Sequence, residues 1–345
     1  MAYTEIDDSG LFFNIKLYTG NSGTQTLTGV GFQPNLTWIK QRSDNTDNTL
    51  YDSVRGATYR IRSNSAVVEA TDVGLTAWNS DGFNIGNHDS TNLNNGTYVG
   101  WNWKAETAFS NDASATSVGS IDSAGSVNTD AGFSIISYTG TGANATIAHG
   151  LGSVPKMYIA RNITDAENWT TYHVVMGATH HLRLNTNVAK VDEAEVWNDT
   201  EPTSTVFSVG SSGAPNGDGD AHIAYCFAEI PGYSKFESYI GNNNADGPFI
   251  YTGFKTAMVI IKRIDDADNW VIYDNKRDGF NGDTHALFPN NSDAQTTDVD
   301  IDLLSNGFKI VRASGRVNAS GGSFIYMAFA ENPLVTSKGV PATAR

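Results

Sequence analysis

The single cysteine and two glutamates are the residues whose spacing first suggests chemistry in this sequence. Cys226 lies three residues before Glu229 in the stretch CFAEI, a spacing that raises the question of a thiol nucleophile with a neighbouring acid. A second stretch, AFAEN, keeps the glutamate as Glu331 but has alanine in place of the cysteine. A reactive thiol needs a nearby base and cationic surroundings, so we interpret Cys226 as a small buried residue. The two carboxylates of a glycosidase must lie within about 5 to 10 Å of each other, and Glu229 and Glu331 belong to different copies of a repeat. We therefore predict no catalytic residue.

The candidates for metal binding are also weak. His180 and His181 are adjacent, so in a strand they point to opposite faces and cannot hold one ion from the same side. Three acidic turns, at 164–168, 216–220 and 265–269, offer the oxygen ligands that calcium prefers. They lack the spacing of a calcium-binding loop, and turns rich in Asp and Asn need no ion to form. We predict no metal site and no cofactor, and leave calcium as the alternative.

Two tryptophans are the candidates for ligand binding. Trp169 and Trp270 occupy equivalent positions directly after acidic turns, where the first copy of the repeat has Asn48. Exposed aromatic rings beside amide and carboxylate groups can stack on sugars, which makes Trp169 and Trp270, with the preceding Asn168 and Asn269, candidate carbohydrate-binding residues. The alternative, which the sequence favours, is that both tryptophans pack in a core.

These residues belong to three copies of one pattern. The last strand of each copy reads TYVGWNWKA (97–105), HIAYCFAEI (222–230) and FIYMAFAEN (324–332). Aligning Trp103, Phe227 and Phe329 puts the bulky residues on one face and mostly small residues on the other, because side chains alternate along a strand. Cys226 falls on the small face, where the other copies have asparagine and alanine. Tandem copies of this kind predict a repeat architecture.

A second strand in each copy carries a cation at its end. The segments are PNLTWIKQR, PKMYIARN and TAMVIIKR, which place Lys40, Arg161 and Lys262 at equivalent positions. Each cation follows a core-facing row of apolar residues. We expect these side chains to extend along the edge of a sheet toward solvent rather than to bind a ligand.

The spacing of strand and turn signals predicts the fold class. Each copy contains about seven or eight short strands separated by clusters of Gly, Asn, Asp or Ser, which is typical of an antiparallel β-sandwich. We predict an all-β protein of three tandem jelly-roll-like β-sandwich repeats, at 1–109, 131–230 and 231–334. The Ser/Ala/Gly-rich segment 110–130 is interpreted as a linker, and 335–345 as a C-terminal tail.

Composition and charge exclude several classes of partner. The 345 residues carry 22 basic and 37 acidic side chains, a formal net charge of -15 that would repel nucleic acid and anionic membranes. No apolar run reaches the length of a membrane span, and the residues after Met1 lack the pattern of a signal peptide. One cysteine cannot form an internal disulfide. We therefore expect no nucleic acid and no membrane among the partners, and no export through the Sec pathway.

Several motifs together resemble a known family. The stretches GFSIISYTGTGANATIAHGLGSVPKMYIARN, YCFAEIPGYSKFESYIG, GPFIYTGF, LLSNGFKI and IYMAFAENP are similar to a repeated β-rich domain of tailed-bacteriophage proteins, found in marine and cyanobacterial phages. The early stretches TLYDSVRGAT, NSDGFNIG and TYVGWNWKA extend the resemblance over nearly the whole chain. It implies a virion or tail-fibre structural protein and supplies no catalytic residues.

The resemblance and the residues lead to one expectation about function. We expect a non-enzymatic virion protein on the particle exterior, assembled in the bacterial cytoplasm, that serves as a fibre or spike component for host attachment. Its expected partners are other virion proteins, with host surface polysaccharide as a candidate ligand and homo-oligomers left open. No heptad stem, collagen-like shaft or β-helix repeat is present, which favours capsid decoration as the alternative. A glycan-cleaving enzyme is the third alternative.

Overall fold

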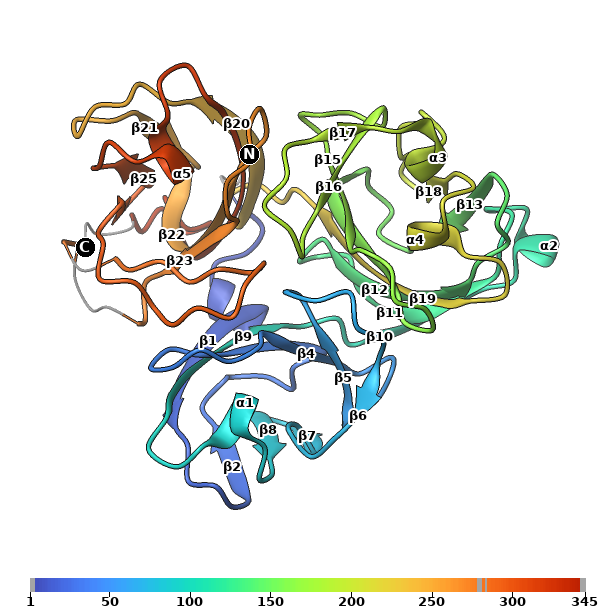
Figure 1. Ribbon diagram of the computed structural model, residues 1–345, viewed down its shortest axis with the longest axis horizontal. Coiled ribbons are helices and arrows are strands. Elements are labelled where there is room, and N and C mark those ends of the chain that lie inside the picture. Colours follow the sequence, from blue (N-terminus) through green and yellow to red (C-terminus); the bar gives the residue numbers. More distant parts are fainter. Residues whose placement is uncertain (1–3, 278–280, 283, 342–345) are drawn as a thin grey trace.

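Antiparallel β-sheets make up the computed structural model, which describes residues 4–277, 281–282 and 284–341. In this part of the chain the helical segments are single turns: η1 (Ser9–Leu11), α1 (Asp89–Asn92), α2 (Ala113–Thr116), α3 (Ala194–Trp197), α4 (Gly213–Asn216) and α5 (Gly315–Asn318). None of them is long and apolar enough to cross a membrane. The predicted all-β fold is confirmed. The sheets form three groups around a common centre, which we call units 1, 2 and 3 (Figure 1).

Unit 1 pairs a six-stranded sheet with a three-stranded sheet. The large sheet has the order β1-β9-β3-β4-β5-β6, and the small sheet has the order β2-β8-β7. The strands are β1 (Phe13–Thr19), β2 (Gln25–Thr28), β3 (Leu36–Gln41), β4 (Thr49–Asp52), β5 (Tyr59–Arg62), β6 (Ala70–Thr71), β7 (Ala77–Asn79), β8 (Gly82–Ile85) and β9 (Thr97–Trp103). Buried side chains from both sheets, including Leu27, Ile39 and Phe83, form one apolar cluster, so the small sheet covers one face of the large one.

Unit 2 repeats this arrangement with a longer sheet. The large sheet has the order β10-β11-β12-β19-β14-β15-β16-β17, and β13 pairs with β18 outside it. The strands are β10 (Thr107–Asn111), β11 (Ser123–Asn128), β12 (Phe133–Thr139), β13 (Ala145–Ala148), β14 (Pro155–Asn162), β15 (Thr170–His173), β16 (His180–Arg183), β17 (Val191–Asp192), β18 (Val206–Val209) and β19 (Ala221–Ala228). Two of these strands lie in segment 110–130 or overlap it. The interpretation of that segment as a linker is therefore wrong, because backbone pairing needs no large apolar side chains.

Unit 3 has a four-stranded and a three-stranded sheet. Their orders are β20-β26-β22-β23 and β21-β25-β24. The strands are β20 (Ser234–Ile240), β21 (Phe249–Tyr251), β22 (Phe254–Arg263), β23 (Val271–Asp274), β24 (Ile301–Leu304), β25 (Gly307–Ile310) and β26 (Ser323–Pro333). The tail after this unit turns back on the N-terminal segment, where Ser337 donates hydrogen bonds to Asp7. Residues 342–345 of the predicted tail lie outside the described part.

The last strand of each unit has both faces buried. Trp101 pairs with Trp38, Tyr225 with Ile159 and Met327 with Ile260, so the aligned residues occupy matching positions in the three large sheets. The small face points into each unit's own sandwich. Cys226 lies there, fully buried, and burial raises the pKa of its thiol to about 12. The interpretation of Cys226 as a small core residue is confirmed.

The bulky face of each large sheet points away from its own sandwich, into a core that all three units share. Trp103, Phe227 and Phe329 meet there, with ring centroids 5.8 to 6.5 Å apart. Phe13 and Phe133 stack on this group from two other strands. Aromatic side chains contribute large apolar areas to a core, so the bulky faces hold the units together.

Buried cations cross the interfaces between units in a cyclic order. Lys40 of unit 1 donates to the carbonyl of Ser292 in unit 3, and Lys262 of unit 3 donates to that of Asn187 in unit 2. Arg161 of unit 2 contacts the carbonyls of residues 66 and 67 in unit 1. The expectation that these side chains reach solvent is wrong, because the neighbouring unit covers each sheet edge. Burial lowers the pKa of Lys40 and Lys262 to about 8.

Buried carboxylates also cross two of the interfaces. The Tyr225 hydroxyl donates to Asp52, and the Asp52 carboxylate is paired with Arg55 in its own unit. Trp101 donates to Asp274 in the same way, and Asp274 is paired with Arg277. Each carboxylate accepts a hydrogen bond from the next unit and is neutralised by an arginine three residues later.

The third interface replaces these charges with neutral groups. The residue facing it is Met327, which has no donor, and the position of the aspartates is occupied by His173. His173 contacts the backbone carbonyl of Tyr326 through Nε2 at 3.2 Å, and Met176 stands where the other units have arginine. Burial lowers the pKa of His173 to about 4, so the imidazole is neutral. Donor, acceptor and counter-charge have thus changed together.

Replacing Arg55 by methionine tests this matching of charges. R55M leaves the buried Asp52 unpaired and should lower the free energy of unfolding by about 3 to 5 kcal/mol. The double variant D52H/R55M copies the pair that unit 2 carries and should recover at least half of the loss. Urea unfolding followed by tryptophan fluorescence measures both variants. A double variant less stable than R55M would contradict the explanation.

Buried histidines make stability depend on pH. The pKa values of His149, His173 and His181 are lowered to about 4 by burial, below the value of about 6.5 in an unfolded chain. The unfolded chain therefore binds more protons as the pH falls from 6.5 toward 4. The free energy of unfolding is therefore highest above about pH 7, where these histidines are neutral in both states. At pH 5 it should be lower by roughly 2 kcal/mol per histidine. Urea midpoints at pH 7.5 and pH 5 test this, and H173Q should show a smaller difference between them.

Candidate functional site

The predicted carbohydrate-binding tryptophans are buried. Trp169 is 0 % exposed and Trp270 is 1 % exposed. The Trp169 indole donates to the carbonyls of Arg62 and Ser65 in unit 1, and the Trp270 indole donates to that of Arg183 in unit 2. The proposal that these rings stack on sugars at the surface is wrong, because each one fills the contact between two units. The alternative of core packing describes them correctly.

The asparagines before these tryptophans hold the same turns. Asn168 accepts a hydrogen bond from Asn185, and Asn269 accepts one from Asn290. Both asparagines are half-buried. In unit 1 the same place is taken by Asp47, which accepts a hydrogen bond from the side chain of Asn64. Their side chains are engaged in fixing the loops that carry the interface residues.

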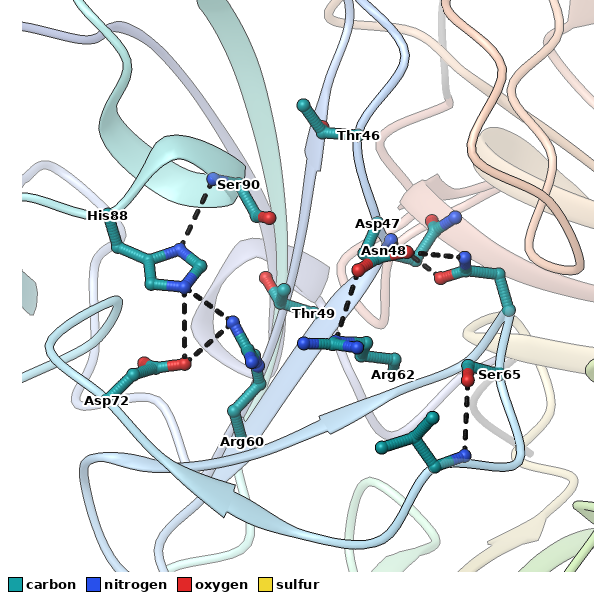
Figure 2. A network of polar contacts seen from close by, with 12 residues as sticks. Thr46, Asp47, Asn48, Thr49, Arg60, Arg62, Ser65, Asp72, His88 and Ser90 are labelled. Carbon is teal, nitrogen blue, oxygen red and sulfur yellow. Dashed lines mark hydrogen bonds and ion pairs between the residues drawn. The ribbon is translucent and has the colours of Figure 1, made fainter. Parts of the chain in front are cut away.

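A histidine beside an aspartate and a serine is the nearest approach to a catalytic arrangement in unit 1 (Figure 2). His88 Nε2 lies 3.5 Å from the carboxylate of Asp72, and Arg60 contacts both groups. Ser90 meets His88 Nδ1 through its backbone N–H, not through its hydroxyl. A serine nucleophile must present its hydroxyl to the histidine, so this network lacks the required contact. It joins α1 to strand β5.

The two glutamates that were weighed as a catalytic pair form contacts with lysines instead. Glu229 accepts hydrogen bonds from Lys235 and from the backbone of Phe236, and Glu331 contacts Lys255. Among the residues that the structure describes, no three His, Cys, Asp or Glu side chains form a group that could hold a metal ion.

An exposed pair of aromatic residues on β21 is the best candidate site. Phe249 is 48 % exposed and Tyr251 is 53 % exposed, while Ile250 between them is buried in the core of unit 3. Residues two apart in a strand share a face, so both rings lie on the outer surface of the small sheet. Lys309 lies directly opposite Phe249, and Asp302 lies opposite Lys309 on the next strand. One surface thus offers two aromatic rings beside a cation and a carboxylate.

The other two units show that the sandwich does not need these rings. Strand pairing places Phe249 and Tyr251 at the positions of Thr26 and Thr28 in unit 1. In unit 2 the corresponding residues are Thr146 and Ala148. The three sandwiches have the same strand pairing at this place, so packing alone does not select aromatic residues. The two exposed aromatic residues therefore distinguish unit 3 from the other two units.

Sequence reasoning missed this pair although a signal was present. The motif GPFIYTGF was noted for its resemblance, and the alternation of Phe249 and Tyr251 around one apolar residue was visible in it. Comparison with Thr26 and Thr28 would have marked the aromatic residues as unusual. That comparison needs the correct alignment of a short strand between variable turns, which the strand pairing supplies.

The chain matches one known protein family over most of its length. A family model described as a domain of unknown function (DUF7483) matches residues 8–333, so the chain belongs to this family. No match was found among curated proteins or solved structures. The family description assigns no activity, and the site must be argued from its residues.

Replacing Trp270 by phenylalanine tests the corrected role of the predicted site. W270F leaves the Arg183 carbonyl without its indole donor and should lower the free energy of unfolding by about 1 to 3 kcal/mol. Binding of any surface ligand should stay unchanged, because the ring is enclosed. Thermal unfolding and glycan-array binding measure the two effects. If W270F kept the stability of the original protein but lost glycan binding, Trp270 would have to be a sugar-binding residue after all.

Proposed function

We propose that this chain is a non-enzymatic structural protein of a tailed-bacteriophage virion that binds host surface glycans through Phe249 and Tyr251. The observation that carries the proposal is the exposure of two aromatic rings at positions where the equivalent sandwiches have threonine or alanine. Both rings lie on the outer surface and belong neither to the core of unit 3 nor to the shared centre. The virion assignment is supported by the sequence resemblance.

The chemistry of the surface suits a sugar chain. Aromatic rings offer flat apolar faces, and a few polar groups beside them fix the orientation of a bound ligand. Here Lys309 is a hydrogen-bond donor, held by an ion pair with Asp246, and Asp302 is an acceptor. Gly307 lies opposite Tyr251 and adds no side chain to the surface there. The surface is shallow, so binding of one site should be weak and should gain strength when many copies are displayed on a particle.

The arrangement of the units supports a role in display. Three sandwiches that share one aromatic core form a rigid support, and loops on a rigid scaffold are well suited to carry binding residues. The buried polar contacts between units are matched in pairs, which fixes the three sandwiches in one relative position. A binding strand on the outer surface of one unit is then presented in a defined direction.

Capsid decoration is the second candidate function. The three-lobed outline, with similar sandwiches around one centre, suits a position where three capsid subunits meet (Figure 1). Immunogold labelling of intact virions separates the two roles. Gold on the tail or on projecting fibres supports attachment, gold over the head supports decoration, and unlabelled particles would contradict the virion assignment.

Exchanging the aromatic pair for the residues of unit 1 tests the attachment site. F249T/Y251T should unfold within about 0.5 kcal/mol of the original protein, because surface substitutions outside packed features have small effects. It should lose at least tenfold in binding to host cells or isolated host glycan. Adsorption inhibition by purified protein measures the loss.

A second exposed aromatic provides the control. Tyr59 of unit 1 is 43 % exposed and lies outside the β21 surface. Y59T should keep full binding. If F249T/Y251T binds glycan as well as the original protein, the site is wrong; if the original protein binds no host surface at all, the attachment function is wrong.

A further inference from the structure

We propose that the outer edge of β10 binds an extended, basic strand of a partner protein, which adds antiparallel to the sheet of unit 2. The hairpin β10–β11 belongs to unit 2 alone. Among the described residues, the corresponding sheets of units 1 and 3 begin at β1 and β20, with no further strand beyond them. A sandwich of this kind therefore forms without the hairpin. This surface is separate from the proposed glycan site on β21.

Strand pairing shows which backbone groups of β10 are unused. In an antiparallel sheet, successive residues bond alternately to one neighbouring strand and the other. Gly140 N–H donates to Asp220 O and Ala228 N–H donates to Gly132 O, so even-numbered residues of β12 bond to β19 and odd-numbered ones bond to β11. The odd-numbered residues of β12 lie opposite even-numbered residues of β11, so the odd-numbered residues of β11 bond to β10. These lie opposite the odd-numbered residues of β10, and the backbone groups of Ala108 and Ser110 therefore point outward.

These outward groups have no partner. In the described part of the chain, no hydrogen bond is formed by the backbone N–H of Ala108 or Ser110. Both residues are exposed, as are Glu106 and Thr107 before them. Unpaired N–H and C=O groups on an exposed edge are a template for an added strand.

On each of the other two large sheets, a side chain covers one outward N–H group of the edge strand. The same alternation makes the N–H groups of Ile15 on β1 and Phe236 on β20 point outward. The Asn14 side chain accepts from Ile15 N–H, and the Glu229 carboxylate accepts from Phe236 N–H. At the equivalent position in unit 2, Ile135 pairs with β11. At this equivalent position the outward N–H is covered by a side chain in units 1 and 3 and by the hairpin in unit 2. The hairpin in turn creates a new edge, on which the N–H groups of Ala108 and Ser110 face outward.

Charge and shape around β10 indicate the kind of strand that fits. Glu106, which is ion-paired with Lys104, precedes the strand, and Asp112 and Asp122 lie at its other end; all three carboxylates are exposed. A cavity of about 460 Å³ beside this end is lined by small and hydroxyl residues, including Ser110 and Ser137, together with the carboxylates of Asp112 and Asp122 and the imidazole of His222. Acidic groups at both ends of an uncharged strand favour a partner with small side chains between lysine or arginine residues. If a second copy of this chain paired its own β10 antiparallel to this edge, Glu106 of each copy would lie near Asp112 of the other, and the like charges would repel.

A proline at Ala108 tests the proposal. A108P removes one outward N–H without removing a bond inside the sheet, and proline is tolerated on edge strands. The probe is a capped, fluorescein-labelled peptide, Lys-Thr-Val-Thr-Val-Thr-Lys, with a control peptide that has glutamate in place of both lysines. Fluorescence polarisation should show saturable binding of the basic peptide to the full chain, about tenfold weaker binding to A108P, and similar weakening for the acidic peptide.

Two further measurements, amide hydrogen exchange and sedimentation equilibrium, test the proposal even if A108P folds poorly. Amide hydrogen exchange of the original protein should be fast at Ala108 and Ser110 and slower at Phe109, with protection of the first two when the basic peptide is bound. Sedimentation equilibrium should give the same molecular mass in solution for the original protein and for A108P. Equal binding by both proteins or by both peptides, or protection of Ala108 in the free protein, would overturn the proposal. A dimer lost in A108P would identify a second copy as the occupant and also overturn it.

Discussion

The shared aromatic centre is the constraint on which the rest of this structure depends. Each large sheet is covered on one face by its own small sheet and on the other by the two neighbouring units. Trp103, Phe227 and Phe329 are buried in the whole chain, and each of these rings contacts the rings of the other two units. One unit alone would expose this face, and large exposed apolar patches are rare in soluble monomers. The three units therefore stabilise each other as a single body.

The polar contacts between units follow from this burial. A donor such as the Tyr225 hydroxyl cannot be left without an acceptor once water is excluded, and Asp52 supplies it. A buried carboxylate in turn needs a counter-charge, which Arg55 supplies. Where Met327 removes the donor, the neutral His173 takes the position of the carboxylate and the arginine is absent. Two interfaces thus satisfy the buried donor with an aspartate and an arginine, and the third uses neutral groups throughout.

The internal copies also separate structural residues from residues with another purpose. Lys40, Arg161 and Lys262 are alike because each closes an interface, whereas Phe249 and Tyr251 depart from their threonine and alanine counterparts at an exposed position. The hairpin β10–β11 is a departure of the same kind, because the described sheets of units 1 and 3 begin at β1 and β20 without it. Such departures between copies are a guide to function, because the copies share one architecture and differ where that architecture leaves their residues free to vary.

The sequence by itself determined the class of the fold and the pairing of faces along its strands. Alternation with a period of two was enough to predict the small face that holds Cys226, since side-chain direction in a strand depends on neighbouring residues only. It was not enough to show that Trp169 and Trp270 are buried, because the groups that cover them, such as Arg62 and Arg183, lie in another unit far along the chain. Segment 110–130 was misread for a related reason, since its strands are held by backbone pairing that composition does not reveal. Local side-chain periodicity thus gave the sheets, and only long-range packing decided which of their faces, edges and aromatic residues remain at the surface.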